Sequence, residues 1–347
     1  MRGLLALSIV CGFIGCSAQD DPGERIVYLS QAGGKSALIS IDPQGEDSRD
    51  LVARTADSPF HWSSREPRVI YTATGQQGKA GIFGVPVMGG QPVAIVDGDE
   101  GRISPDARQM VFGAGEMRQL KLFDMMTAEV KDLKGANGYA PRWSPESLYI
   151  AYQSWPRDAG YLYLQSRHGN RKVQLTRHTA NGAQWSPDGT ALVYSRSGGE
   201  AAGLYLVYLD GASVRLTYHK ARDPQWSPDG QTIAYQREGD ERSVNGAIYV
   251  VGIGEDPKPL TGHAGMRPQW SPSGASLVYT RASDKSLCRV EVAGGPSIKL
   301  ADGPADYAQW SGPGRATKAV AGSKSPAVPG SSSPTDPPPT PDGSDDF

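Results

Sequence analysis

The chain has 347 residues, with 35 lysines and arginines, 37 aspartates and glutamates, and a formal net charge of −2. This near-neutral balance lacks the clustered basic surface that nucleic-acid binding requires, so we expect no nucleic-acid partner. The 43 glycines and 27 prolines suit a turn-rich all-β chain, and 38% hydrophobic residues are too many for a wholly disordered one.

The first residues carry one charge, at Arg2, and then an apolar run from Leu4 to Ile14. The run is too short to span a bilayer as a helix, but it fits the hydrophobic region of a secretory signal. It ends in Phe13-Ile14-Gly15-Cys16, which resembles a bacterial lipobox. The resemblance implies a lipoprotein signal peptide over 1–15, a tether over 16–24 and acylation of Cys16, which would anchor the protein to a membrane.

Ser17 follows this cysteine, which by analogy with Gram-negative lipoproteins favours the outer membrane. The alternative is ordinary secretory cleavage, for instance after Ala18, which would leave a soluble periplasmic protein. With Cys16 acylated, Cys288 has no partner, so we expect no disulfide. At the other end, residues 312–347 are rich in proline and serine and predict a disordered tail.

Between these ends, a motif recurs at spacings of 41, 40, 42, 41, 44 and 40 residues. Its anchor is a Trp-Ser pair, with Ile103 in place of the tryptophan in one copy, and an aromatic residue follows nine positions after each of the first six anchors. The anchor tryptophans are Trp62, Trp143, Trp185, Trp226, Trp270 and Trp310.

The best copies read AQWSPDGTALVYSR and PQWSPDGQTIAYQR. This pattern predicts a strand ending in Trp-Ser, a tight Pro-Asp-Gly turn and a returning β-branched and aromatic strand. Two further short strands follow in each copy. Four antiparallel strands at a period near 41 residues are typical of β-propeller blades, so we expect a propeller over 25–311.

Two partial repeats lie at the ends of the array. Residues 25–53 hold three expected strands, and residues near 306–311 hold one. If they share a blade, the ring closes without exposed strand edges and has seven four-stranded blades. A count of six blades is the alternative and would discard one partial repeat.

The Trp-Ser-Pro-Asp-Gly repeat with its trailing apolar-apolar-Tyr resembles the propeller of TolB, the Tol-Pal system protein, and is similar to propellers of the prolyl oligopeptidase class. The TolB resemblance implies a non-enzymatic binding or scaffold module, monomeric and without a cofactor, whose partner is an envelope protein or peptide. The peptidase class carries its nucleophile on a separate hydrolase domain, but no Gly-x-Ser-x-Gly motif occurs in this sequence. The remaining alternative is a propeller lyase, hydrolase or binding protein acting on polysaccharide.

Candidate catalytic residues are few. His178, His219 and His263 share one repeat position, seven residues before an anchor, and two hypotheses apply: a shared metal site or a turn residue copied by duplication. We favour the turn, because residues in successive rotated blades cannot converge within the short metal–histidine bond length. The sequence therefore predicts neither a catalytic nor a metal site.

One repeated feature suggests a function. The residue before each anchor is polar in all copies: His61, Arg102, Arg142, Gln184, Gln225, Gln269 and Gln309. If each tryptophan packs between blades, alternation along the strand directs its predecessor to the opposite face. These residues either form a polar ring at the central channel or hydrogen-bond neighbouring blades together, and we favour the second interpretation.

Overall fold

The computed structural model describes residues 24–310, except 32–35, 54–59, 64–66, 75–78, 157–159, 170 and 239–245. The predicted signal peptide, Cys16 and the predicted tail lie outside the described residues. Within the described part, the elements are antiparallel strands and one short 3-10 helix, η2 (Gly199–Ala201). No helix there is long and apolar enough to cross a membrane.

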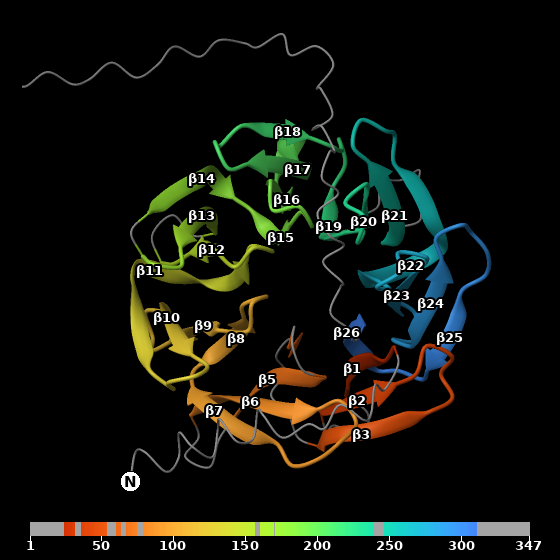
Figure 1. Cartoon of the computed structure of the whole chain (residues 1–347). Coiled ribbons are helices and arrows are strands. Elements are labelled where there is room, and N and C mark those ends of the chain that lie inside the picture. The colour runs from red at the N-terminus through yellow and green to blue at the C-terminus, as the bar shows by residue number, and fades with distance from the viewer. Residues whose placement is uncertain are drawn as a thin grey trace, which may run out of the picture.

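The strands are arranged as a ring of sheets around a common centre (Figure 1). Three sheets have four strands each. In spatial order the first is β26 (Ala305–Trp310), β1 (Ile26–Ser30), β2 (Ala37–Ile41) and β3 (Ser48–Ala53). The second is β4 (His61–Trp62), β5 (Arg68–Thr74), β6 (Ala80–Pro86) and β7 (Val93–Asp97). The third is β15 (Asn181–Trp185), β16 (Ala191–Arg196), β17 (Gly203–Tyr208) and β18 (Ser213–Arg215).

Two sheets have seven strands each. One contains β8 (Asp99–Ile103), β9 (Gln109–Ala114), β10 (Gln119–Asp124), β11 (Val130–Trp143), β12 (Tyr149–Ser154), β13 (Tyr161–Ser166) and β14 (Lys172–Thr179). The other contains β19 (Ala221–Trp226), β20 (Thr232–Arg237), β21 (Ala247–Gly252), β22 (Lys258–Trp270), β23 (Ser276–Arg281), β24 (Leu287–Glu291) and β25 (Ile298–Ala301).

The long strands β11 and β22 make these two sheets continuous. The first part of β11 pairs with β10 and its last part, from Gly138, pairs with β12. In the same way, β22 pairs first with β21 and then, from Gly265, with β23. Each long strand therefore runs from the outer edge of one four-stranded unit to the inner edge of the next.

The repeated turn has the chemistry that its sequence predicts. In the copy after Trp185, the Ser186 hydroxyl donates to the Asp188 carboxylate (2.6 Å) and accepts from the Ala191 N–H (3.0 Å). Gly189 follows with φ of +72°, a left-handed conformation that glycine adopts without strain. The turn thus holds the inner strand and the returning strand in register.

The aromatic residue nine positions after the anchor lies in the core between neighbouring sheets. Tyr194 and Tyr235 are fully buried, and Tyr235 packs with Val193 and Leu206 of the preceding sheet. Burial of this kind stabilises face-to-face packing of successive blades by about 1.5–3 kcal/mol per large side chain.

The first and last described strands, β1 and β26, close the ring within one sheet. Ile26 of β1 pairs with Trp310 of β26, and Ser30 pairs with Ala305. Residues that are far apart in the sequence thus lie on adjacent strands, β1 and β26 (Figure 1). The fold is an all-β propeller with blades of antiparallel strands.

Candidate functional site

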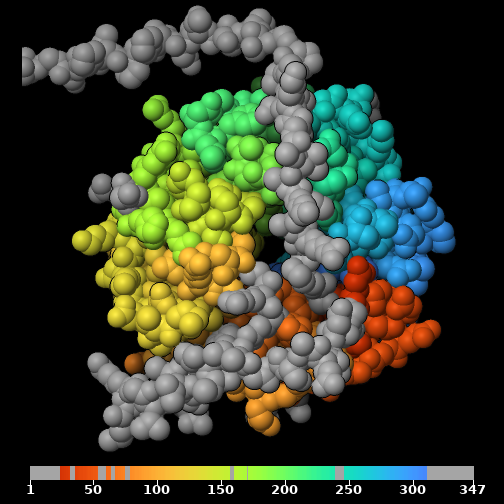
Figure 2. Space-filling view, viewed as in Figure 1, coloured from red at the N-terminus to blue at the C-terminus, as the bar shows by residue number. Residues whose placement is uncertain are grey.

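The polar residues that precede the anchors lie on the strands nearest the centre of the ring (Figure 1). They lie on β4, β8, β11, β15, β19, β22 and β26, in the order His61, Arg102, Arg142, Gln184, Gln225, Gln269 and Gln309. The space-filling view shows a hollow near the centre of one face, beside the orange and green parts of the chain (Figure 2).

The anchor tryptophans hold the backbone of these residues. Trp143 Nε1 donates to the Arg102 carbonyl of the preceding blade (2.9 Å), and Trp185 Nε1 donates to the Arg142 carbonyl (3.2 Å). Trp270 makes the same contact with the Gln225 carbonyl (3.0 Å). Each of these tryptophans therefore points toward the preceding blade, a link between repeats that the sequence did not reveal.

One side chain of the set makes an inter-blade contact. Gln309 Nε2 donates to the carbonyl of Phe60, which lies just before β4 in the next blade (2.9 Å). This bond is of the kind that the second interpretation, hydrogen bonding between blades, predicts for the whole set.

The two arginines of the set differ from Gln309. Arg102 is 8% exposed, and its Nε and Nη1 atoms are buried without a hydrogen-bond partner among the described residues. Arg142 Nε is also buried without a described partner. Burial lowers the pKa of both guanidinium groups, and the nearby Arg142 charge lowers that of Arg102 further.

A second group of residues stands two positions before His61, Arg102, Arg142 and their equivalents in the sequence, and we call it the second layer. The residues at this position have left-handed backbones in every described copy, next to a bulge in the inner strand. They are Glu100, Ala140, Gly182, Asp223, Arg267 and Tyr307, with φ between 50° and 62°. Bulges redirect side chains and are common beside binding sites. The residue types at this position differ from copy to copy, so no repeated residue marks this layer in the sequence.

One charged group in this layer is the Arg267 cluster, defined as Asp223, Arg267, Asp306 and Tyr307. Arg267 forms an ion pair with Asp306, and its guanidinium lies 4.0 Å from the centre of the Tyr307 ring. Burial raises the pKa of Asp223, while the Arg267 and Arg222 charges oppose that shift.

The other is the Arg118 cluster, defined as Asp99, Glu100 and Arg118. The Glu100 carboxylate accepts hydrogen bonds from the Ala140 N–H (2.6 Å) and from Arg118 Nη1 (3.4 Å). Burial raises the pKa of Asp99, with the Arg118 charge acting against it and Glu100 adding to it. Partly buried carboxylates with raised pKa values are typical of binding and catalytic sites.

The three repeated histidines each contact a tyrosine of the blade that follows; His178 on β14, for example, contacts Tyr194 on β16 of the next sheet. The Nε2 atoms of His178, His219 and His263 lie 2.9, 2.9 and 2.7 Å from the hydroxyl oxygens of Tyr194, Tyr235 and Tyr279. His178 and His263 lie within strands, so the expectation of turn residues was wrong for these two. No group of three or more histidine, cysteine or acidic side chains suited to a metal occurs in the described part of the chain.

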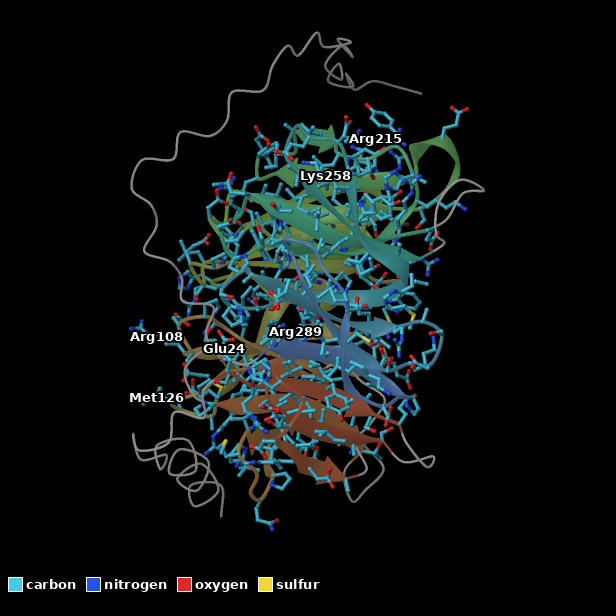
Figure 3. The ribbon with its side chains drawn as sticks, turned by 90° about the vertical axis from the view of Figure 1, so that its right-hand side faces the viewer. Glu24, Arg108, Met126, Arg215, Lys258 and Arg289 are labelled. Atoms are coloured by element: carbon cyan, nitrogen blue, oxygen red, sulfur yellow. The ribbon has the colours of Figure 1, made fainter. Side chains whose placement is uncertain are left out.

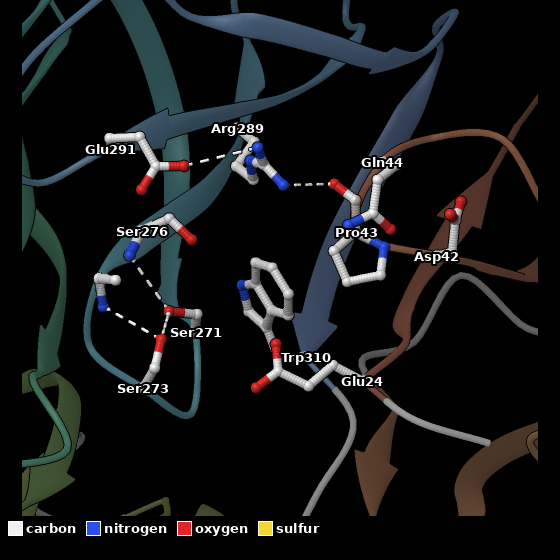
Figure 4. A pocket seen from close by; sticks show the side chains of 11 residues that line it. Glu24, Asp42, Pro43, Gln44, Ser271, Ser273, Ser276, Arg289, Glu291 and Trp310 are labelled. Atoms are coloured by element: carbon white, nitrogen blue, oxygen red, sulfur yellow. Dashed lines mark hydrogen bonds and ion pairs between the residues drawn. The ribbon is translucent and has the colours of Figure 1, made fainter.

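A pocket of about 530 Å³ lies where the last blade meets the closing sheet (Figure 4). Its lining includes Glu24, Pro43, Ser271, Arg289 and Trp310. Arg289 Nη1 donates to the Pro43 carbonyl (2.6 Å), and this hydrogen bond joins the last blade to the sheet of β26 and β1–β3. Sequence reasoning missed this pocket. Its signal was Arg289, which occupies the strand position of the apolar Leu206 in another repeat.

The ring of antiparallel blades, with polar side chains gathered on the inner strands, defines a β-propeller. The described fold agrees with the sequence comparison, in which the TolB beta propeller domain matches residues 136–315, a little over half of the chain. The chain belongs to the TolB beta propeller domain family.

Solved structures show the same fold at low sequence identity. TolB from Acinetobacter baumannii is 18% identical with a TM-score of 0.55, over 87% of this chain and 70% of that one. An oligogalacturonate lyase from Vibrio parahaemolyticus is 12% identical with a TM-score of 0.57, over 80% and 85% of the two chains. A puromycin-hydrolysing peptidase from Mycobacterium tuberculosis is 14% identical with a TM-score of 0.60, over 80% of this chain and 53% of that one. No curated protein matches the sequence.

Proposed function

We propose that this protein is a non-enzymatic binding module of the cell envelope that recognises a protein or peptide partner at the centre of its propeller. The observation that carries the proposal is the gathering of charged and polar side chains on the inner strands of a TolB-family propeller. Propellers support several activities, so the function rests on this site rather than on the fold.

We propose that the ring contains seven blades and acts as a monomer. The way in which the strands divide among the sheets supports this number. Strands β11 and β22 each contribute to two four-stranded units, and β26 completes the sheet of β1–β3. Closure pairs the edge of β1 with β26, so that edge is not available for pairing with a second copy.

We propose that acylated Cys16 anchors the propeller, on the outer membrane, with residues 16–24 as a tether. The sequence Phe13-Ile14-Gly15-Cys16 supports this assignment. More than one acyl chain is needed for stable anchoring, which lipoprotein acylation supplies.

Affinity capture from native envelopes tests the function and the anchor together. Wild type, Cys16→Ala and Cys11→Ala are compared, with Cys11 serving as the matched N-terminal cysteine. We expect wild type and Cys11→Ala to capture one discrete protein partner. Only the Cys16→Ala protein should no longer be found in the membrane fraction. Recovery of glycan without a protein partner would contradict the binding-module proposal.

A second candidate function is a lyase or hydrolase acting on polysaccharide. The partly buried carboxyl groups of Asp99 and Asp223 favour this alternative, because burial raises their pKa values and a carboxyl group with a raised pKa is a better candidate for a general acid. Incubation with envelope polysaccharides, followed by chromatography of the products, tests it. Cleavage by wild type that is lost in Asp223→Asn and kept in the exposed-site control Asp256→Asn would support the enzyme.

A further inference from the structure

Two arginines on neighbouring inner strands have buried, unpartnered donor atoms. Arg102 on β8 and Arg142 on β11 belong to adjacent blades, because Trp143, next to Arg142, donates to the Arg102 carbonyl (2.9 Å). Arg102 is 8% exposed, and its Nε and Nη1 have no described hydrogen-bond partner; the same is true of Arg142 Nε. Buried guanidinium donors without acceptors destabilise the protein unless an acceptor reaches them.

The nearby carboxylates do not fill this role. Glu100 raises the pKa of Arg142, so its charge is felt there, but its two oxygens bond the Ala140 N–H and Arg118. Arg118 also pairs with Asp99 at 4.0 Å. The guanidinium groups of Arg102, Arg118 and Arg142 outnumber the carboxyl groups of Asp99 and Glu100 by one, which leaves a local excess of one basic group.

We propose that Arg102 and Arg142 form a binding site for a carboxylate group of the partner, an inference that rests on the binding function proposed above. The planar guanidinium group accommodates a carboxylate through paired N–H donors. A local excess of one basic group matches a singly charged carboxylate better than a phosphate. His61, at the equivalent position of β4, adds a fourth buried nitrogen, Nε2, without a described partner.

The test titrates the full chain with N-acetylglutamate amide and, as the uncharged control, N-acetylglutamine amide. Calorimetry measures affinity and thermal unfolding measures the ligand-induced rise in Tm. The variants are Arg102→Met, Arg142→Met and Arg142→Lys. The matched control is Arg108→Gln, because Arg108 is exposed and points away from the molecule (Figure 3).

We expect wild type and Arg108→Gln to bind the glutamate probe with a Kd on the order of 1 mM and not to bind the glutamine probe. Arg102→Met and Arg142→Met should weaken binding at least tenfold, and neither should lower Tm without ligand, because each removes an uncompensated like charge. If either variant fails to fold, two measurements still test the site. One is binding by Arg142→Lys, and the other is the NMR shift of the arginine Nε–H resonances of wild type during the titration.

Equal binding by Arg142→Met and wild type, or equal binding of both probes, would overturn the proposal. Binding of inorganic phosphate in preference to the glutamate probe at matched ionic strength would overturn the carboxylate assignment. Repeating the envelope capture with Arg142→Met separates the two proposals. Unchanged partner capture without glutamate binding would refute only the arginine site, whereas absence of a partner for wild type would refute the binding function.

Discussion

At the scale of single residues, the anchor tryptophans have two environments. Trp270 Nε1 donates to the Gln225 carbonyl of the preceding blade (3.0 Å), whereas Trp226 Nε1 is buried without a described partner. Both rings are partly buried and both precede a Ser-Pro turn. The pair therefore separates the contribution of the hydrogen bond from that of the ring.

We predict that Trp270→Phe lowers the free energy of unfolding by about 1 kcal/mol more than Trp226→Phe does. Only the first substitution removes a hydrogen bond to a carbonyl oxygen. Urea unfolding of both variants measures the difference. Equal destabilisation would mean that the bond to Gln225 contributes nothing.

The His178–Tyr194 pair makes stability depend on pH. Burial, and then the Arg196 charge, lower the pKa of His178 below its usual value near 6.5. The folded state thus binds a proton less readily than the unfolded state does. The stabilisation is complete above about pH 6.5 and decreases as the pH falls through the lowered folded-state value.

We predict that His178→Gln reduces the loss of stability between pH 7 and pH 5, because glutamine does not titrate. Thermal unfolding at both values measures the change, with the exposed His168→Gln as the control. An unchanged loss in His178→Gln would show that this imidazole does not contribute to the pH dependence.

At the scale of the element, each hairpin depends on its turn. Asp188 Oδ1 accepts from the Ser186 hydroxyl (2.6 Å) and from the Thr190 N–H (3.1 Å). In the copy with serine in the aspartate position, Ser273 makes longer contacts, 3.1 Å to the Ser271 hydroxyl and 3.3 Å to the Ala275 N–H. The same fold therefore contains a strong and a weak form of one turn.

We predict that Asp188→Ala costs about 1–2 kcal/mol of stability and that Ser273→Ala costs less than half as much. The carboxylate is the better acceptor, so its removal leaves more donors unsatisfied. Equilibrium unfolding in urea compares the two variants. A larger loss for Ser273→Ala would contradict this ranking.

At the scale of the whole molecule, stability depends on ring closure. The strand β26 covers the edge of β1 and places Ala305, Ala308 and Trp310 in the core with Ile26. Its removal would expose a long apolar strand edge, which promotes aggregation.

We predict that a chain ending at Pro304 loses at least about 3 kcal/mol of stability and aggregates on heating, since it loses a large buried aromatic as well as strand pairing. A chain ending at Gly312 keeps β26, so it should unfold within about 2 °C of the full chain. Calorimetry and light scattering measure both. Equal stability of the two truncated chains would contradict the role of β26 in closure.

Much of this architecture was predictable from the sequence. A fixed period, a turn motif and two complementary partial repeats predict a closed β-propeller, because local turn chemistry and strand alternation repeat in every copy. The prediction that both chain ends contribute strands to one sheet is confirmed by the pairing of β1 with β26. The number of blades, the anchor at Cys16 and the polar ring stay predictions.

Only the tertiary structure showed which side chains meet across blades. The sequence placed Arg102 and Arg142 at equivalent positions, but their proximity and the bond from Trp143 to Arg102 depend on how successive sheets pack. The pocket lined by Arg289 and Pro43 likewise brings together residues 246 positions apart. The sequence by itself determined the blade, because a blade is local in the chain. Packing decided the site, because inter-blade contacts depend on side-chain directions that spacing does not specify.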